Sequence, residues 1–460
     1  MIIGGGPGGY EAAIRLHQYG IGCAVVESGR IGGVCLNWGC IPTKALVRSA
    51  EAYSDLKESA GFGLPSSVQS LDYRQVFARK NAVVEQLVGG IEFLFQKRGI
   101  PILPERAISI GKSGSGYLVK TDKGSDLTAD YLIVATGSLP RDLPGVAIDE
   151  QGILSSTGVL QLDQLPASLA VVGGGVIGCE FASIMNTFGV QTQIIEFLPR
   201  ILATEDEEIS KRLTTALKKA GIKITTGVGV QSAKTVPDGQ ELLLSDGSAL
   251  IVEKVLLSVG RKPQTDVIWE GLDLEMDKGA IVIDATLRTN LPGVYAIGDV
   301  TGKLPLAHTA SKQGFIAAAH ILSRIQGSEF QYPPLNYANI PRCTFTVPEV
   351  ASVGLTEAEA KQAYTDVLVG KFPFSANGKA LAMGNTYGLV KTIARADTAA
   401  LVGMHIIGPH AAELIAQGSI LLSLGATASS VEQVVFAHPT LSEAIMESLE
   451  DLHNLSIHKI

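Results

Sequence analysis

Apolar residues recur in two segments of the chain that follow the same plan. The first segment starts with residues 1–3, passes through a glycine-rich turn at 4–9 and continues with apolar positions at helical spacing up to Leu16. The second starts with the apolar run 169–172 and passes through a glycine-rich turn at 173–178. A strand, a glycine turn and a helix in this order are typical of a doubly wound α/β domain, so the pattern predicts two such domains.

Each segment then reaches a second apolar run that ends in a glutamate, Glu27 in the first and Glu196 in the second. In a dinucleotide-binding domain the glycines let the pyrophosphate approach the helix N-terminus, and the acidic residue binds the ribose. The glycines expected to do this are Gly4, Gly6 and Gly9 in the first turn, and Gly173, Gly175 and Gly178 in the second. The Glu196 carboxylate would repel a 2′-phosphate, which favours NAD over NADP; a solvated strand-end residue is the alternative.

The last third of the chain has a different pattern. Apolar residues alternate with others at 388–393 and 401–406, which predicts an antiparallel sheet. The uncharged stretch 414–431 holds too many polar residues for a membrane span, so it predicts a helix buried in a core or at a subunit interface.

Charge and length narrow the class of protein. The chain has 460 residues and should divide into several domains. Its net charge of −8 argues against a nucleic-acid partner, which usually needs a basic surface. The first residues show no export signal, and we expect a cytoplasmic protein with no membrane partner.

Two of the five cysteines, Cys35 and Cys40, form a close pair. In an ideal helix, residues five apart have Cα atoms about 8 to 9 Å apart, which is beyond the reach of a disulfide. Gly39 and Pro42 permit a distorted backbone that could bring the sulfurs together. No nearby cysteine or histidine has metal-ligand spacing, so we expect no metal. Two unrelated buried thiols are the remaining alternative, and we expect Cys23, Cys179 and Cys343 to be inert core residues.

The stretch from Gly33 to Lys44 resembles the redox-active signature of the pyridine nucleotide-disulfide oxidoreductases, and within that family the motifs most resemble the dihydrolipoamide dehydrogenases. The resemblance implies FAD at the first glycine turn and NAD at the second. It implies that Cys35 meets the substrate, that Cys40 lies beside the flavin, and that Lys44 lies near the flavin ring and pairs with Glu180. Without the resemblance, Glu180 would be a charge on a helix surface.

Four further stretches are similar to parts of the same family. Those at 131–138 and 306–308 resemble segments that complete the FAD site, with Thr136, Gly137 and Ala307 as contacts. The stretch at 293–299 resembles a second FAD fingerprint, in which Asp299 would hold the ribityl chain; a plain turn residue is the alternative. The stretch at 258–263 resembles the hinge that leaves the NAD domain and would place Gly260 near the nicotinamide.

A histidine and a glutamate near the end of the chain, His438 and Glu443, complete the resemblance. Thiol chemistry needs a proton acceptor near neutral pH, and a carboxylate can orient the imidazole ring. In the family this pair comes from the opposite subunit, which implies a homodimer. The alternative is a helix capping box formed by residues 440–443.

The resemblance implies a fold of class α/β, with two Rossmann-like dinucleotide-binding domains and a C-terminal α+β dimerisation domain. The expected domains are an FAD-binding domain at 1–142, an NAD-binding domain at 143–262, a central domain at 263–335 and an interface domain at 336–460. The implied activity is oxidation of dihydrolipoyl groups carried by a partner acyltransferase or by a glycine cleavage carrier protein.

Three other functions stay open at this stage. A glutathione-type reductase should have basic residues where Glu196 stands, because it uses NADP. A mercuric reductase should have a C-terminal cysteine pair, whereas no cysteine follows Cys343. A non-catalytic flavoprotein that acts as a binding subunit would not need the paired cysteines or His438.

Overall fold

The computed structural model describes residues 1–65 and 70–459, which form two compact units. The first unit contains Met1–Ala45, Arg74–Arg141 and Gly260–Leu335, and the second contains Leu46–Tyr73, Asp142–Val259 and Asn336–Ile460. The chain therefore passes between the units near residues 45, 73, 141, 259 and 335, while the division into four domains stays a prediction.

A five-stranded parallel sheet lies in the first unit. Its strands, in order across the sheet, are β21 (Val294–Ala296), β7 (Leu132–Val134), β1 (Ile2–Ile3), β2 (Val25–Val26) and β3 (Ile102–Leu103). Neighbouring residues of β1 enter different cores, since Ile2 packs with one apolar cluster and Ile3 with another. This alternation is the two-residue period of a strand and means that both faces of the sheet are covered.

Helices α1 (Pro7–Gln18) and α8 (Ala307–Gln326) pack closely against each other in this unit. A Cβ atom added to Gly314 of α8 would lie 2.8 Å from the carbonyl oxygen of Gly8, so only glycine permits this approach. Helix α4 (Tyr73–Arg98) contributes Val84, Val88 and Phe95 to the same core. The unit also holds a four-stranded sheet made of β18 (Ile268–Glu270), β4 (Ala107–Ser113), β5 (Gly116–Thr121) and β6 (Asp126–Ala129).

The second unit also contains a five-stranded parallel sheet, and four of its strands follow the same order as in the first sheet, which confirms the internal repeat seen in the sequence. The fifth, an edge strand, is the first of the five along the chain here, whereas in the first sheet it is the last. Its strands are β12 (Lys223–Thr226), β11 (Gln191–Glu196), β10 (Ser168–Val172), β16 (Lys254–Leu257) and β9 (Ile153–Leu154). In both sheets the strand before the glycine turn is central, with the strand that ends in glutamate beside it. Helices α6 (Val176–Thr187) and α7 (Glu207–Lys219) follow in sequence after β10 and β11 respectively.

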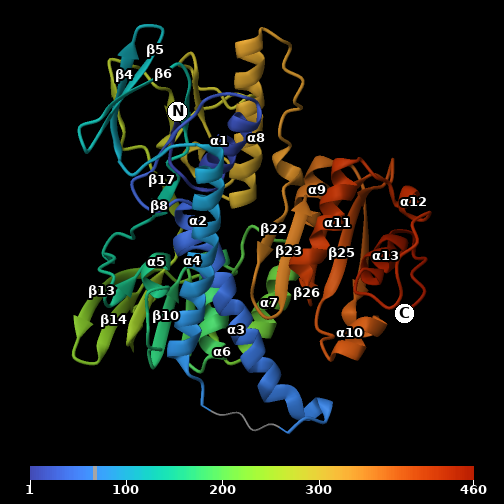
Figure 1. The fold of residues 1–460 in the computed structure, drawn as a ribbon. Helices are drawn as coiled ribbons and strands as arrows, with labels where there is room; N and C mark the ends of the chain where they lie inside the picture. The colour runs from blue at the N-terminus through green and yellow to red at the C-terminus, as the bar shows by residue number, and fades with distance from the viewer. Residues whose placement is uncertain (66–69, 460) are drawn as a thin grey trace. The chain divides into compact units, whose positions relative to one another are not determined.

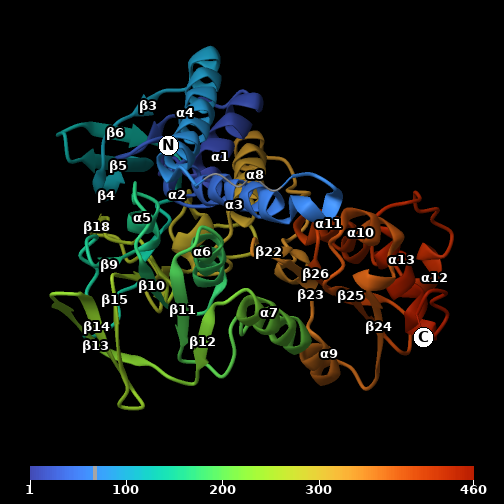
Figure 2. The same cartoon turned by 90° about the horizontal axis from the view of Figure 1, so that it is seen from below.

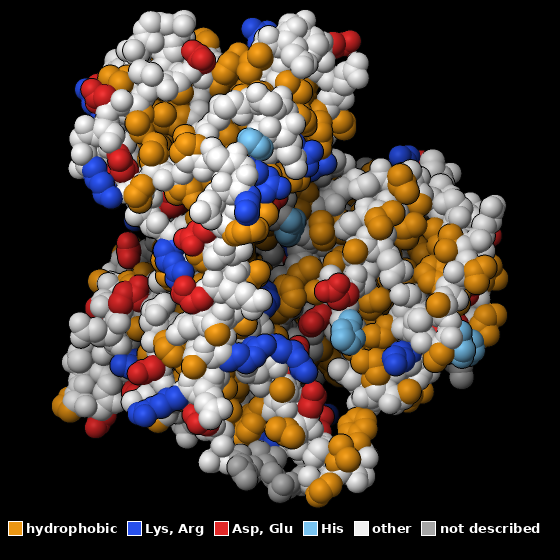
Figure 3. All heavy atoms as spheres, viewed as in Figure 1, with side chains coloured by type: hydrophobic (Ala, Val, Ile, Leu, Met, Phe, Trp, Pro, Cys, Tyr) orange, Lys and Arg blue, Asp and Glu red, His pale blue; other side chains and the backbone are white. Residues whose placement is uncertain are grey.

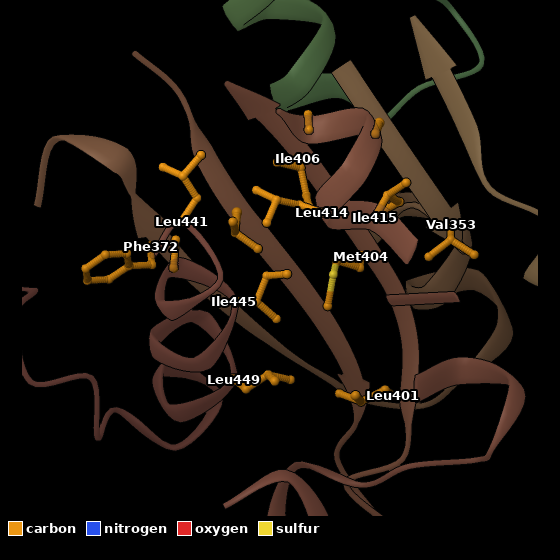
Figure 4. Close-up of a cluster of buried hydrophobic side chains, with 14 of the residues drawn as sticks. Val353, Phe372, Leu401, Met404, Ile406, Leu414, Ile415, Leu441, Ile445 and Leu449 are labelled. Carbon is orange, nitrogen blue, oxygen red and sulfur yellow. The ribbon is translucent and has the colours of Figure 1, made fainter. Parts of the chain in front are cut away.

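An antiparallel sheet organises the C-terminal part of the second unit and confirms the alternating pattern of the sequence. Its strands are β22 (Arg342–Thr344), β23 (Glu349–Gly354), β26 (Leu401–Gly408), β25 (Leu389–Arg395) and β24 (Val367–Pro373). Helices α11 (Ala411–Ser423) and α13 (Glu443–Glu450) cover it (Figures 1 and 2). Buried side chains from the sheet and both helices form one core (Figure 4), including Val353, Phe372, Leu401, Met404, Ile406, Leu414, Ile415, Leu441, Ile445 and Leu449.

The stretch 414–431 is not one helix, so that prediction was wrong in its extent. Helix α11 ends at Ser423, and a separate short helix, α12 (Ala428–Val431), follows. Gly425 lies between them with a φ of 63°, a conformation that interrupts a right-handed helix. Among the described residues, no helix is both long and apolar enough to cross a bilayer.

A row of polar side chains crosses the antiparallel sheet and meets the start of α7. Strand pairing aligns Arg342, Ser352, His405, Lys391 and Lys371 on neighbouring strands. The Lys391 ammonium is only 2% exposed and lies 2.8 Å from an oxygen of Asp206 and 2.7 Å from an oxygen of Glu357. Burial of a lysine is costly unless the charge is paired, so these two carboxylates permit Lys391 to stay charged.

We expect Lys391→Met to destabilise the protein strongly, because it leaves Asp206 as a buried charge without its lysine partner. Loss of one member of a buried pair costs about 3–5 kcal/mol. The urea unfolding midpoint, followed by circular dichroism, should fall well below that of Lys211→Met, which removes only an exposed pair with Glu207. Equal midpoints for the two variants would contradict a structural role for the buried pair.

Candidate active site

The two glycine turns have nearly the same geometry. The first glycine of each turn has a positive φ, 104° at Gly4 and 107° at Gly173. The third glycine of each lies against the first, because an added Cβ would come 1.9 Å from the Gly4 oxygen at Gly9 and 2.0 Å from the Gly173 oxygen at Gly178. Both turns therefore require glycine for conformation and for close packing of helix on strand.

Gly6 and Gly175, the middle members of the two sets of site glycines, face open space. No atom lies within 4 Å of a Cβ placed on Gly175, and for Gly6 the nearest is the Gly33 Cα at 4.0 Å. These glycines are the N-caps of α6 and α1, and neither helix start is capped by a side chain of its N-cap residue. Such a helix N-terminus, reached without steric hindrance, fits a pyrophosphate. Both turns can thus accommodate a dinucleotide.

The two strand-end glutamates bind their own glycine turns. Glu27 accepts the N–H groups of Gly5 at 2.6 Å and Gly29 at 2.7 Å. Glu196 accepts the N–H groups of Gly174 at 2.5 Å and Leu198 at 2.7 Å, and it is 9% exposed. Glu196 is therefore not a solvated strand-end residue. Each carboxylate oxygen keeps a further lone pair, so these bonds leave room for ribose hydroxyls.

The paired cysteines lie on either side of a break between two helices. Helix α2 (Gly33–Trp38) ends before Gly39, and α3 (Cys40–Glu58) begins directly after it. Gly39 has φ −148° and ψ −108°, which is not helical. An added Cβ there would lie 3.0 Å from the carbonyl oxygen of Val34, so the fold brings the two chain segments into close approach. The prediction that Gly39 permits distorted backbone between the cysteines is confirmed.

The side chains of Cys35 and Cys40 interact with each other. A hydrogen bond between Cys35 and Cys40, together with burial, raises the pKa of Cys35, while the positive charge of Lys44 acts in the opposite direction. Lys44 is one turn after Cys40 in α3, as expected if the helix resumes there. Among the described residues, no cluster of three or more histidine, cysteine or acidic side chains could hold a metal ion.

Asp299 belongs to a hydrogen-bond network in the same unit and is not a plain turn residue. The Ser138 hydroxyl donates to Asp299 at 2.5 Å, and the Arg261 guanidinium donates to the Ser138 hydroxyl at 2.7 Å and to its carbonyl at 2.6 Å. Burial lowers the pKa of Arg261, and the charges of Asp299 and Cys40 oppose that shift. Sequence reasoning gave no role to Ser138 or Arg261, although each directly follows a glycine with positive φ.

The other residues expected to contact FAD, and Gly260, which is expected near the nicotinamide, lie at or near the ends of elements in this unit. Thr136 follows β7 and donates to the Gln264 carbonyl at 2.6 Å, and Gly137 has a φ of 77°. Ala307 is the first residue of α8. Gly260, with a φ of 114°, accepts the Arg141 N–H through its carbonyl. Their contact with a cofactor stays a prediction.

Glu180 is buried in the second unit. It is 4% exposed and accepts the Phe345 N–H at 2.9 Å. The interpretation as a charge on a helix surface is therefore wrong, since the residue lies on the packed side of α6. Its pairing with Lys44 stays a prediction.

His438 and Glu443 form a hydrogen-bonded pair at the start of α13. The His438 Nδ1 atom lies 2.8 Å from one oxygen of Glu443, and the other oxygen accepts the Thr440 N–H at 2.8 Å. The bond from the Thr440 N–H to Glu443 is one half of a capping box, but the Thr440 hydroxyl donates to the Ala437 carbonyl and does not cap the helix, so the box is incomplete. The side chain of His438 is 78% exposed and is free to meet a substrate or a second chain.

Glu443 is held in the ionised form. Burial would raise its pKa, but the Thr440 N–H and the His438 ring outweigh burial and lower the pKa below its ordinary value. A carboxylate that stays charged can fix the hydrogen on Nδ1 of His438 and leave Nε2 as the proton acceptor.

Comparison with known families covers nearly the whole chain. The pattern described as "Pyridine nucleotide-disulphide oxidoreductase" matches residues 1–314, and the pattern described as its "dimerisation domain" matches residues 340–449.

Individual proteins match over similar lengths. A dihydrolipoyl dehydrogenase of Bacillus subtilis is 42% identical over 100% of this chain and 98% of its own length. One from Thermus scotoductus is 40% identical, again over 100% of this chain and 98% of its own length. The crystal structure of LpdA from Mycobacterium tuberculosis has a TM-score of 0.88 at 26% identity, covering 98% of this chain and 99% of that one.

A second kind of flavoprotein also shares the fold. The HOCl-induced flavoprotein disulfide reductase RclA from Escherichia coli has a TM-score of 0.85 at 26% identity, covering 98% of both chains. With repeated glycine turns, a cysteine pair at a helix break and both family patterns present, this chain belongs to the pyridine nucleotide-disulphide oxidoreductase family.

Proposed function

We propose that this chain is a dihydrolipoyl dehydrogenase, which oxidises dihydrolipoyl groups and reduces NAD. The observation that carries the proposal is the Cys35–Cys40 pair, whose thiols meet across the helix break at Gly39. Relatives with this name are 37–42% identical over almost the full chain, and they supply the substrate class.

Two cofactors complete the reaction. FAD is assigned to the first glycine turn, with Glu27, Asp299 and Lys44 as contacts, and NAD to the second, with Glu196 and Gly260 as contacts. When bound, FAD supplies the means to take an electron pair from the cysteines and to pass it on as hydride to NAD. The protein's part is to bind, orient and shield these groups.

The thiol steps use side chains of this chain. His438 accepts the proton of one substrate thiol, and the resulting thiolate attacks Cys35 of the oxidised pair, which releases Cys40 as a thiolate. The second substrate thiol then attacks the substrate sulfur that is bonded to Cys35, and Cys35 leaves as a thiol that takes up the proton of the attacking thiol. The substrate leaves as a cyclic disulfide, and both cysteines are left reduced, having gained two electrons.

The positive groups of the first unit support the proposed role of Cys40. The Lys44 charge acts on the cysteine pair from one turn away, and the charges of Arg261 and Cys40 also interact. Positive charge near a thiol stabilises the thiolate. Cys40 is therefore suited to stay ionised after Cys35 has been attacked.

We propose that the chain acts as a homodimer in which His438 serves the cysteine pair of the other subunit. The match to a dimerisation domain supports this, and so does the apolar surface of this region (Figure 3). Val435 is 94% exposed and Leu424 is 78% exposed in the single chain. Large apolar side chains with such exposure are typical of protein interfaces.

The expected partners are lipoyl groups on an acyltransferase or on a glycine cleavage carrier protein. The closest competing functions fit the chain less well. RclA is 26% identical, against 42% for the Bacillus subtilis relative. Glu196 does not suit an NADP-dependent glutathione-type reductase, and no cysteine follows Cys343 for a mercuric reductase.

We expect Cys35→Ser and Cys40→Ser to abolish oxidation of dihydrolipoamide with NAD, because each removes half of the electron relay. The variants should retain bound flavin. They should also retain electron transfer from NADH to an artificial dye, because that reaction does not need the thiols. Cys23→Ser is the matched control, since that thiol donates to the Ala13 carbonyl and packs against the core of the first unit. Retained dihydrolipoamide turnover in either variant of the pair would refute the assignment.

We expect His438→Gln to slow dihydrolipoamide oxidation by about 10² to 10⁴, the usual contribution of general acid–base catalysis. Stopped-flow measurement of flavin reduction by dihydrolipoamide would isolate the thiol step. His17→Gln replaces an exposed histidine of α1 and should keep the normal rate. A normal rate in His438→Gln would leave the histidine with a structural role only.

We expect Glu196→Gln to weaken the preference for NAD over NADP by about tenfold, equivalent to ~1.4 kcal/mol, since a neutral amide no longer repels a 2′-phosphate. The ratio of kcat/KM for the two nucleotides measures this. The amide oxygen can still accept one of the two backbone N–H groups that Glu196 binds. An unchanged ratio would show that the carboxylate does not face the ribose.

A further inference from the structure

A two-stranded ribbon belongs to the first unit at the places where the chain leaves that unit and returns to it. Its strands are β8 (Ser138–Pro140) and β17 (Arg261–Pro263), which pair antiparallel (Figure 1). The chain leaves the unit after Arg141 and re-enters it at Gly260, so each strand adjoins one of these crossings. The two strands come from distant parts of the chain and meet beside Asp299.

Ser138 connects this ribbon to Asp299. Its hydroxyl donates to Asp299 Oδ2 at 2.5 Å and accepts the Arg261 Nε–H at 2.7 Å. The Arg261 guanidinium also donates to the Ser138 carbonyl at 2.6 Å and lies 4.0 Å from Asp299 Oδ2. Because a guanidinium only donates, it leaves the hydroxyl hydrogen of Ser138 for another acceptor. Ser138 and Arg261 together therefore direct a donor at one oxygen of Asp299.

This network is largely shielded from water. Ser138 is 4% exposed, and the side chains of Arg261 and Asp299 are 17% and 25% exposed. A hydrogen bond to a charged group is stronger than one between neutral groups, and it is weakened less where water has limited access. The carboxylate of Asp299 is therefore held in one orientation.

The backbone next to Asp299 is fixed by a separate contact. Gly298 has a φ of 73°, and its N–H donates to the side-chain oxygen of Gln313 on α8 at 2.6 Å. Gln313 is fully buried. The backbone at this point thus has an anchor of its own, and removal of the Ser138 hydroxyl should free the side chain of Asp299 without moving its backbone.

We propose that Ser138 and Arg261 are positioning residues for Asp299, which hold its carboxylate in the orientation that binds a hydroxyl of the FAD ribityl chain. The inference rests on the proposed function, in which Asp299 is a contact of FAD. Both interactions with Asp299 involve Oδ2, so they leave Oδ1 as an acceptor for the ligand. A carboxylate that is already oriented loses little side-chain freedom on binding, which favours slow release of FAD.

The test is the rate at which the full-length holoenzyme loses FAD, measured as the flavin that stays with the protein in gel filtration at successive times. We expect Ser138→Ala to lose FAD about tenfold faster than the unaltered protein, the order expected when one hydrogen bond to a charged group is removed. Arg261→Met should act in the same direction, because the Ser138 hydroxyl is then no longer oriented.

Ser323→Ala and Arg106→Met are matched controls in the same unit. Ser323 has a buried hydroxyl that donates to the His320 carbonyl within its own helix, and Arg106 pairs with Asp266 at the surface. Both variants should lose FAD at the unaltered rate. An unaltered rate in Ser138→Ala, or an equal acceleration in Ser323→Ala, would overturn the inference.

A double-mutant cycle distinguishes positioning of Asp299 from a general loosening of the ribbon. Asp299→Ala removes the side chain on which Ser138 acts, so Ser138→Ala should not accelerate FAD loss further in that background. Titration of FAD into flavin-free protein gives the same comparison for variants that bind FAD weakly. Additive effects would show that Ser138 only stabilises the ribbon, and the inference would be wrong.

The same measurements separate this inference from the proposed function. If Asp299→Ala keeps FAD as firmly as the unaltered protein, the assignment of Asp299 as a cofactor contact fails, and the inference fails with it. If Asp299→Ala loses FAD faster and Ser138→Ala does not, only the positioning role is refuted. Neither outcome depends on the turnover of dihydrolipoamide, which tests the cysteine pair.

Discussion

Two sulfur atoms five residues apart can meet only if no regular helix connects them, and the protein satisfies this condition at one glycine. Gly39 leaves the helical conformation, and the close approach of the Val34 carbonyl would crowd a side chain there. The cysteines then face each other, with Lys44 one turn further along α3. The proposed chemistry depends on this break, because a continuous helix would hold the thiols too far apart to exchange electrons.

Besides the cysteine pair, the protein contains two copies of one motif that consists of a strand, a glycine turn and a helix. In each copy a glutamate at the end of the neighbouring strand accepts N–H groups from the glycine turn and from the residue two positions after itself. The carboxylate therefore shapes the turn through hydrogen bonds within the protein. A turn that is already formed loses little conformational freedom on binding, which favours affinity for the dinucleotide. The family uses FAD and NAD, and the assignment of FAD to the first turn and NAD to the second is part of the proposed function.

The C-terminal part of the second unit contains two kinds of charged cluster, one buried and one partly exposed. Lys391 is buried and balanced by Asp206 and Glu357, so its contribution is to the fold of that unit. Two glutamates of α13 pair with histidines, Glu443 with His438 and Glu447 with His458. These pairs are arranged differently, since both histidines are largely exposed while the carboxylate of Glu447 is buried. Rigid carboxylates with exposed imidazoles allow proton exchange with solvent or substrate without movement of the helix.

The sequence by itself determined the features that depend on local spacing: two glycine turns, their strand-end glutamates, the break between the cysteines and the alternating strands near the C-terminus. It could not determine the burial of Glu180, the network of Ser138 and Arg261 with Asp299, or the pairing of His458 with Glu447. Those side chains are brought together from distant parts of the chain, and an isolated charged residue has no periodic signal. Only the tertiary structure decides which of these side chains come into contact. The reason is that the strength of each polar interaction depends on the burial of the two groups and on the distance between them.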